Sequence, residues 1–307
     1  MKWLPRILMV LLVALPTVAQ EPPDFSKASV DTLHVAGSVH LLRTECPVGN
    51  PSVVASVGED GYLLVDTAFA GMGDKLLAAL AKVGPGQVEF VVNTHPHWDH
   101  TNGNLFFGED TTILGRPLLR EALIESGDFG EPMAEKGWPE ITLDRPLRLH
   151  FNGETVEVIP MKPGHTNGDI IVYFEGSGVL ATGDYFFFER YPIIDLEGGG
   201  SFTGYFENIK EMLGRFPAET RVVPGHSTFA PKEPQVTDMA GFRAWYEAML
   251  DSIDFIIGER KAGKSAADIE NKGLPFRFAR FSERPRFVKV EKWIQNVYED
   301  APDGGVR

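Results

Sequence analysis

The chain has 307 residues, of which 43% are hydrophobic and 23% are charged, a composition that excludes a disordered, collagen-like or polytopic membrane protein. Its 29 basic and 43 acidic residues give a net charge of −14, so nucleic acids and acidic membranes are not expected partners. Cys46 is the single cysteine, which excludes an internal disulfide and a thiolate zinc cluster. Any metal must therefore be held by nitrogen and oxygen.

The first residues have the pattern of an export signal. Lys2 and Arg6 precede a nine-residue apolar run, Ile7 to Leu15, and a small residue, Ala19, ends the segment. Nine residues are too few for a membrane span, which needs about 20. We therefore expect cleavage after Ala19, a periplasmic or secreted protein, and no stable membrane association of the mature chain. Cleavage leaves 27 basic and 43 acidic residues, a net charge of −16.

In the first part of the mature chain, strand patterns and a helical pattern alternate. Turn residues separate the strands, and Gly84-Pro85-Gly86 ends the helical spacing of the leucines before it. The expected elements are strands at 39–43, 52–57 and 62–65, a helix through Leu76 and Val83, and a buried strand at 88–92.

Two hairpins and three helices are expected after that. Asn152-Gly153 favours a tight turn, because both residues readily adopt positive φ. The expected elements are hairpins 147–151/155–159 and 170–174/179–182, a helix at 205–213, a strand at 221–223, a long helix with its apolar face from Phe242 to Ile257, and a last helix with its apolar face from Phe287 to Val297. We expect an α/β fold with mixed sheets covered by helices, in which 1–19 is the signal peptide and 20–307 is one domain with a helical part from about 236.

The strongest chemical signal is Thr94-His95-Pro96-His97-Trp98-Asp99-His100, directly after the apolar strand 88–92. Three histidines and an aspartate within six residues are hard to explain as packing, and they offer the ligand types that zinc accepts. Three later residues next to glycines can complete such a site, because glycine lets the backbone pass close to a metal. They are His165, Asp184 and His226.

These residues resemble the metallo-β-lactamase superfamily, whose motifs occur here in the family's order over about residues 30 to 230. The resemblance implies an αββα sandwich of two mixed β-sheets flanked by helices. It also implies that His95, His97 and His165 bind the first metal, that Asp99, His100 and His226 bind the second, and that Asp184 bridges them. Asp66 matches the family's aspartate that orients a metal-binding histidine, and Thr166 is a weaker candidate for that role.

The donor set fits two Zn²⁺ ions, with iron or manganese as alternatives. A water bridging two such ions would ionise near neutral pH and attack a carbonyl carbon, so Asp99 and Asp184 act catalytically with a metal-bound hydroxide. We therefore expect an exported dinuclear zinc hydrolase whose partner is a small carbonyl substrate, namely an ester, lactone, thioester or β-lactam.

The alternatives are a dedicated β-lactamase, a metal-dependent phosphodiesterase and a single-iron sulfur dioxygenase. Phe186 and Phe187 stand where many β-lactamases carry a Lys or Ser that binds the carboxylate of the drug, with Arg190 as a substitute. The complete His/Asp set instead resembles the glyoxalase II and lactonase branches. The aromatic residues between 185 and 205 have two interpretations: they form an apolar pocket at the metals, or they fill the core.

Overall fold

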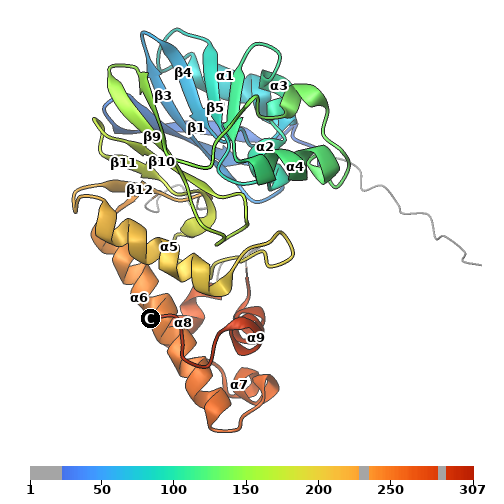
Figure 1. Ribbon diagram of the computed structural model, residues 1–307, viewed down its shortest axis with the longest axis vertical. Helices are drawn as coiled ribbons and strands as arrows, with labels where there is room; N and C mark the ends of the chain where they lie inside the picture. Colours follow the sequence, from blue (N-terminus) through green and yellow to red (C-terminus); the bar gives the residue numbers. More distant parts are fainter. Residues whose placement is uncertain (1–22, 228–234, 283–287) are drawn as a thin grey trace, which may run out of the picture.

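Two mixed β-sheets face each other in the computed structural model, which describes residues 23–227, 235–282 and 288–307 (Figure 1). In spatial order the first sheet contains β1 (Ser29–Ala36), β2 (Val39–Glu45), β3 (Ser52–Gly58), β4 (Gly61–Val65), β5 (Val88–Val92), β6 (Thr112–Gly115) and β7 (Ile141–Thr142). The second contains β13 (Thr237–Asp238), β12 (Arg221–Val223), β11 (Val179–Ala181), β10 (Ile170–Phe174), β9 (Glu154–Pro160) and β8 (Leu147–Phe151).

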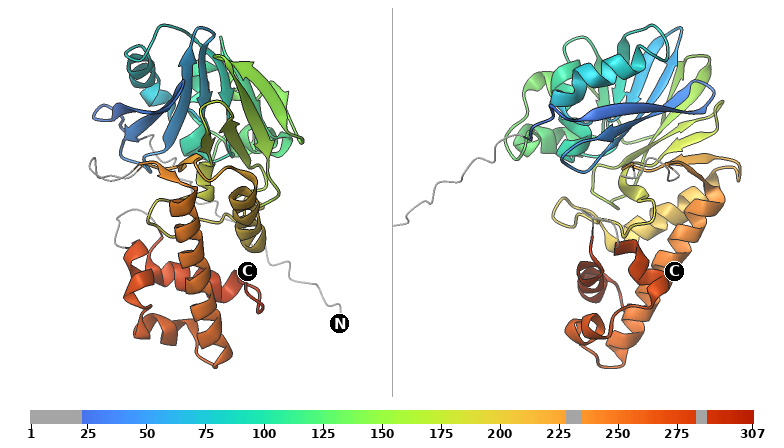
Figure 2. Two further views of the ribbon diagram at one scale, coloured as in Figure 1. Left: turned by 90° about the vertical axis from the view of Figure 1, so that its left-hand side faces the viewer. Right: turned by 180° about the vertical axis from the view of Figure 1, so that it is seen from behind.

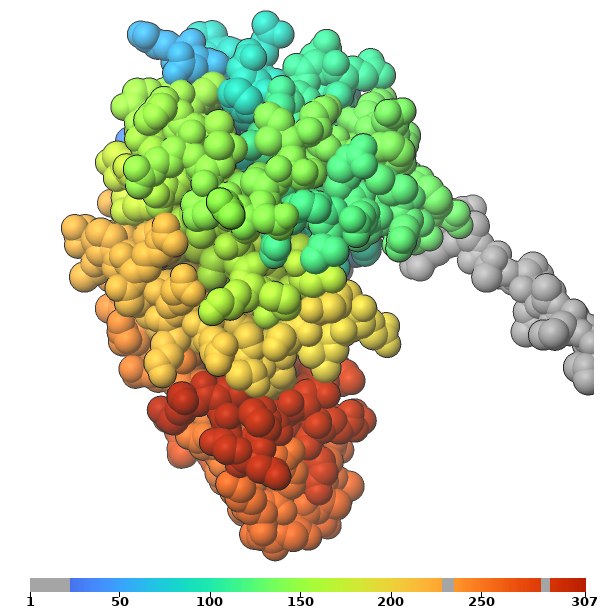
Figure 3. Space-filling model, in the orientation of Figure 1, coloured from blue at the N-terminus to red at the C-terminus, as the bar shows by residue number. Residues whose placement is uncertain are grey.

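The nine α-helices of the described residues cover the outer faces of the sheets and extend away from the second sheet. They are α1 (Gly73–Leu80), α2 (Trp98–Thr101), α3 (Asn104–Phe107), α4 (Pro117–Ser126), α5 (Phe202–Arg215), α6 (Met239–Lys261), α7 (Ala266–Lys272), α8 (Phe276–Ala279) and α9 (Val290–Asp300). In both views of Figure 2, α6 runs from the second sheet to the far end of the molecule, where α7 to α9 lie beyond α5. The space-filling view shows the same elongated shape, with the C-terminal helices in orange and red at one end (Figure 3).

Three apolar clusters hold these layers together. One lies between the sheets and includes Val65, Val92 and Val172. A second packs α1 against the outer face of the first sheet through Leu76. The third runs without interruption from the outer face of the second sheet, through α5, to the C-terminal helices. This is the αββα sandwich that the family resemblance implies.

Most expected elements are present, with small differences at their ends. Asn152 and Gly153 have φ of +50° and +78°, so the first hairpin turns where predicted. The first helix is shorter than its leucine spacing suggests, because α1 ends at Leu80 and Val83 lies in the following turn. The expected signal peptide and Phe287 lie outside the described residues. Several elements were not expected from the sequence, among them β1, β6, α4 and α7.

No helix in the described ranges is long and apolar enough to cross a membrane.

Candidate metal centre

The candidate ligands follow the carboxyl ends of four strands. β9, β11 and β12 run in one direction, because β10 is antiparallel to β9 and β11 while β12 is parallel to β11. Their carboxyl ends therefore meet at one edge of the second sheet. In chain order, His95, His97, Asp99 and His100 follow β5, His165 follows β9, Asp184 lies in the single-turn 3₁₀ helix η3 (Gly183–Tyr185) after β11, and His226 follows β12.

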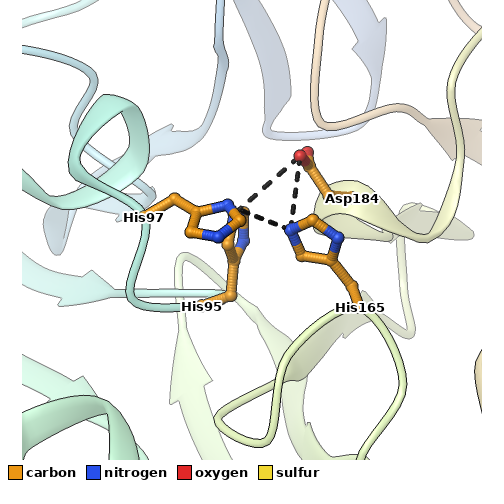
Figure 4. Close-up of side chains that lie close together, drawn as sticks. All are labelled: His95, His97, His165 and Asp184. Carbon is orange, nitrogen blue, oxygen red and sulfur yellow. Dashed lines mark hydrogen bonds and ion pairs between the residues drawn. The ribbon is translucent and has the colours of Figure 1, made fainter. Parts of the chain in front are cut away.

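Four residues form a first group with ligand atoms within 4.8 Å of one another: His95, His97, His165 and Asp184 (Figure 4). Nε2 of His165 lies 3.1 Å from Nδ1 of His97 and 3.6 Å from Oδ2 of Asp184. Nε2 of His95 lies 3.9 Å from the same carboxylate oxygen. Three imidazoles thus direct nitrogen atoms at one point beside a carboxylate.

Asp99, His100 and His226 form a second group with the same spacing. Their two imidazoles approach through Nε2 atoms 3.2 Å apart. Asp184 lies between the groups, with Oδ1 3.4 Å from Nε2 of His100 and Oδ2 3.3 Å from Nε2 of His226. Its carboxylate therefore lies within reach of both groups.

Asp66 fixes the orientation of the His-rich loop. Its Oδ2 accepts hydrogen bonds from the Thr94 hydroxyl at 2.7 Å and from Nδ1–H of His100 at 2.8 Å, while Oδ1 accepts the Thr94 main-chain N–H. Since the Thr94 hydroxyl proton goes to Asp66, its oxygen accepts Nδ1–H of His95 at 2.9 Å. Asp66 thus contacts one candidate metal-binding histidine directly, as the family resemblance implies.

The outer nitrogens of the other three imidazoles also have acceptors. Nδ1–H of His165 donates to the main-chain oxygen of Ile193, and Nδ1–H of His226 donates to that of Gly49, both at 2.9 Å. Nε2–H of His97 donates to Oδ2 of Asp195 at 2.9 Å. Because each ring has an acceptor at its outer nitrogen, the inner nitrogen of each neutral ring presents a lone pair toward the centre.

A metal would satisfy this arrangement. Among the described side chains, Nε2 of His95 and Oδ1 of Asp184 are buried without a hydrogen-bond partner, which is costly unless a cation binds them. Nδ1 of His97 and Nε2 of His165 lie 3.1 Å apart, and their lone pairs repel each other until a cation lies between them. Two groups of imidazole and carboxylate donors fit two zinc ions.

The pKa values show which charge the cluster favours. Burial lowers the pKa of His95 well below its usual value and that of His165 to about 4, so both rings are neutral at pH 7. Burial also disfavours the charged form of His100, but Asp184 and two further carboxylates outweigh it and raise this pKa to about 10. The carboxylates therefore favour positive charge at the centre, which a divalent cation would supply instead of a proton.

Two glycines allow the main chain to pass close to side chains of the centre. A Cβ at Gly225 would lie 2.0 Å from Oδ1 of Asp184, far inside van der Waals contact. Gly183 has φ of +52°, and a Cβ there would lie 2.8 Å from Oγ1 of Thr94. The Gly-Asp and Gly-His pairs of the sequence are thus needed for close approach, as expected.

The aromatic residues after Asp184 fill the core. Tyr185, Phe186, Phe187, Tyr191, Phe202 and Tyr205 are all buried, and Phe188 is partly buried. The ring of Phe187 stacks on His226 with centroids 5.7 Å apart. Of the two interpretations of this segment, core packing is therefore the correct one. Arg190 is also fully buried, with Nη2 3.5 Å from the main-chain oxygen of Ser227, so it does not reach the cavity described below.

Two features of the site carried no recognisable sequence signal. Asp195 lies in an irregular segment 98 residues after His97, where an aspartate followed by glycines suggests an ordinary turn. Asp169 holds the turn after His165 by accepting hydrogen bonds from the Thr166 main chain and hydroxyl and from the Tyr185 hydroxyl. The Thr166 hydroxyl therefore supports the turn through Asp169 and does not contact a histidine ring.

A cavity of ≈ 630 Å³ opens beside His97 and Asp195. Trp98 forms part of its wall and packs on Phe129 and Phe69, with ring centroids 4.8 Å and 5.2 Å away. Its described lining contains no lysine or arginine. The apolar lining residues are Pro23, Val48, Pro96, Trp98, Ala122 and Phe129.

Comparisons with known proteins agree with this geometry. Residues 45–226 match the family model of the metallo-β-lactamase superfamily. The chain is 27% identical over 192 residues to metallo-beta-lactamase domain-containing protein 1 of Xenopus laevis, covering 57% of this chain and 76% of that protein. It is 30% identical over 161 residues to a hydroxyacylglutathione hydrolase of Thermosynechococcus vestitus, covering 50% of this chain and 54% of the relative.

Solved structures share the fold as well. A metallo-beta-lactamase from Pontibacter korlensis superposes with a TM-score of 0.57 at 16% identity, over 71% of this chain and 98% of the other. The match to the family model includes the His-rich loop, His165, Asp184 and His226, the residues that gather at the edge of the sheets. The chain therefore belongs to the metallo-β-lactamase superfamily and is a metal-dependent hydrolase.

Proposed function

We propose that this chain is an exported dinuclear zinc hydrolase that cleaves a small carbonyl substrate, an ester, lactone, thioester or β-lactam. The observation that carries the proposal is the position of Asp184 between two groups of inward-facing imidazole and carboxylate donors. A pair of divalent metals held there would acidify a water molecule and polarise a carbonyl. The chain's own contribution is to hold five imidazole rings in fixed orientation through their outer nitrogens.

The lining of the cavity favours an uncharged, partly apolar substrate. Its aromatic wall at Trp98 and Phe129 suits an acyl or ring group, while Asp195 at its edge disfavours anions. A phosphodiester would find no cationic group among the described lining residues. The hydroxyacylglutathione hydrolase relative acts, by its name, on a thioester, and that chemistry belongs to the same class of carbonyl substrates.

Metal content and a substrate panel test the reaction. We expect two zinc ions per purified chain, and hydrolysis of aryl esters or acyl-homoserine lactones in preference to bis-p-nitrophenyl phosphate. Nitrocefin turnover as the dominant activity would instead identify a dedicated β-lactamase, and one iron per chain would identify a dioxygenase.

Metal removal tests the mechanism. EDTA should abolish hydrolysis and added Zn²⁺ should restore it, because no protein side chain is proposed as nucleophile. His97→Ala should remove activity, whereas Cys46→Ala should leave it nearly unchanged, since burial raises the pKa of the Cys46 thiol and keeps it unreactive. Turnover by metal-free protein, or an acyl-enzyme seen by mass spectrometry, would contradict the proposal.

Export is supported by the apolar run before Ala19. N-terminal sequencing of the protein from a periplasmic fraction should give a chain that begins at or near Gln20. A cytosolic chain that retains Met1 would show that this part of the proposal is wrong.

A further inference from the structure

One irregular segment, residues 191–201, contacts two imidazoles of the first group from their outer side. The main-chain oxygen of Ile193 accepts Nδ1–H of His165, and Oδ2 of Asp195 accepts Nε2–H of His97, both at 2.9 Å. The opposite nitrogens of these rings face each other 3.1 Å apart. The segment thus determines the direction in which both lone pairs point.

We propose that Asp195 is a positioning residue of the metal centre, whose carboxylate holds His97 so that Nδ1 faces the metal. This inference rests on the metal centre proposed above. Asp195 lies on the outer side of the ring and bonds the nitrogen that faces away from the cluster, so it acts through His97.

His97 needs such a partner more than the other candidate ligands. Its side chain is 28% exposed, whereas those of His95, His100, His165 and His226 are at most 5% exposed. Packing fixes the four buried rings, but one side of His97 borders the cavity. A half-turn of the His97 ring about Cβ–Cγ would put carbon Cδ2 where Nδ1 now lies and would remove one ligand. The hydrogen bond to Asp195 opposes that rotation.

The segment also holds Asp195 itself in place. Its Oδ1 accepts the Gly198 main-chain N–H at 2.9 Å, its main-chain N–H donates to the His165 carbonyl at 2.9 Å, and its carbonyl accepts the Gly200 N–H at 2.8 Å. A Cβ at Gly198 would lie 2.2 Å from Oδ2 of Asp195, and one at Gly200 would lie 2.5 Å from the His165 oxygen. The three consecutive glycines therefore allow the close fit that brings the carboxylate to His97.

The test compares the full chain with Asp195→Ala and Asp195→Asn. Zinc stoichiometry and dissociation constants are measured by competition with a chromophoric chelator, and the Co²⁺-substituted proteins are compared by visible spectroscopy. We expect Asp195→Ala to lower the affinity for one of the two zinc ions about 10-fold. This is the low end of the range for losing the hydrogen-bond partner of a metal ligand, because the His97–Asp195 pair is partly exposed. Asp195→Asn keeps a hydrogen-bond acceptor but not the negative charge, so it should lower the zinc affinity less. The cobalt spectrum should change for one metal.

Asp303→Asn is the matched control. Asp303 also makes a 2.9 Å hydrogen bond, to Arg260, but it is exposed and lies in the C-terminal region. This variant should keep wild-type zinc affinity and the wild-type cobalt spectrum. Thermal unfolding of the metal-free proteins should give similar midpoints for wild type and all three variants.

Three outcomes decide the matter. Wild-type zinc affinity and cobalt spectrum in Asp195→Ala would overturn the inference. Loss of both zincs together with a lower unfolding midpoint of the metal-free variant would assign Asp195 a structural role and would also overturn it. If wild type binds a single metal, the dinuclear function is wrong, and the inference then holds only if Asp195→Ala weakens that metal.

Discussion

At the scale of single residues, Gly225 leaves no room for a side chain beside the carboxylate of Asp184. Gly225→Ala would place a Cβ 2.0 Å from Oδ1 of Asp184, so Asp184 must move. We expect this variant to lose at least one of the two zinc ions and most of the hydrolytic activity. Inductively coupled plasma mass spectrometry measures the zinc content. The shift displaces the carboxylate from His100 as well as from His226.

A second glycine provides the control. Gly214 lies inside α5, where an added Cβ would have no neighbouring atom within 4 Å, so Gly214→Ala should keep both zincs and raise helix stability by about 0.5–1 kcal/mol. Full zinc occupancy in Gly225→Ala would show that Asp184 tolerates displacement and does not need this close approach.

The residues differ in how far the sequence could predict them. His95, His97, Asp99 and His100 lie within six residues, so their common purpose is visible without a structure. Asp195 is distant in sequence from His97 and has no motif of its own, because its position depends on the path of an irregular glycine-rich segment. Only the tertiary fold brings its carboxylate to the ring.

At the scale of elements, Glu157 joins β9 to two neighbours. Its carboxylate accepts hydrogen bonds from Arg148 on β8 at 2.8 Å and from Arg215 at the end of α5 at 3.1 Å. The Arg148 hydrogen bond is the main cause that lowers the pKa of Glu157. A carboxyl group whose pKa is lower in the folded protein stabilises the fold at pH values above its unfolded pKa. That stability is lost as the pH falls through the folded pKa.

We therefore expect Glu157→Gln to lower the free energy of unfolding by about 1 kcal/mol at pH 7. This difference from wild type should shrink as the pH falls below the unfolded pKa of the carboxyl group and disappear once the pH has passed the lowered pKa of Glu157. Urea unfolding of the metal-free protein across this range measures it. Glu175→Gln, which removes a more exposed carboxylate 3.6 Å from Arg148, should cost less at every pH. A Glu157→Gln difference that grows on acidification would have the wrong sign for this explanation.

The elements themselves were predictable where the pattern was strong. The hairpin at Asn152-Gly153 and the amphipathic α6 carry local signals in their turn residues and apolar spacing. β6 is only four residues long and α4 has a narrow buried face, Leu119 and Leu123, so neither has a distinct period. Their conformation depends on the parallel pairing of β6 with β5.

At the scale of the whole molecule, α9 contacts the segment that orients the candidate ligands. Trp293 is fully buried, its ring stacks on Tyr191 with centroids 5.1 Å apart, and its Nε1–H donates to the Ser252 hydroxyl of α6 at 3.0 Å. Tyr191 begins the segment that contains Ile193 and Asp195. The C-terminal helices are thus linked to the first group through Tyr191 and the segment that follows it.

Trp293→Ala should therefore lower the free energy of unfolding by about 3–5 kcal/mol, the usual cost of removing a buried aromatic ring. Because one apolar cluster includes the second sheet and the C-terminal helices, we expect a single unfolding transition by both circular dichroism and fluorescence. Trp293→Phe keeps an aromatic ring and should cost less. Two separate transitions in wild type would contradict the prediction that residues 20–307 form one domain.

The stacking of Trp293 on Tyr191 also has a consequence for the order of events during synthesis. Every candidate metal ligand has been synthesised once the chain reaches His226, yet Trp293 follows 67 residues later. Until it arrives, Tyr191 lacks its aromatic neighbour and the segment that carries Asp195 lacks its support from α9. The nascent chain would therefore hold metal only weakly, and firm metal uptake would be one of the last steps of its maturation.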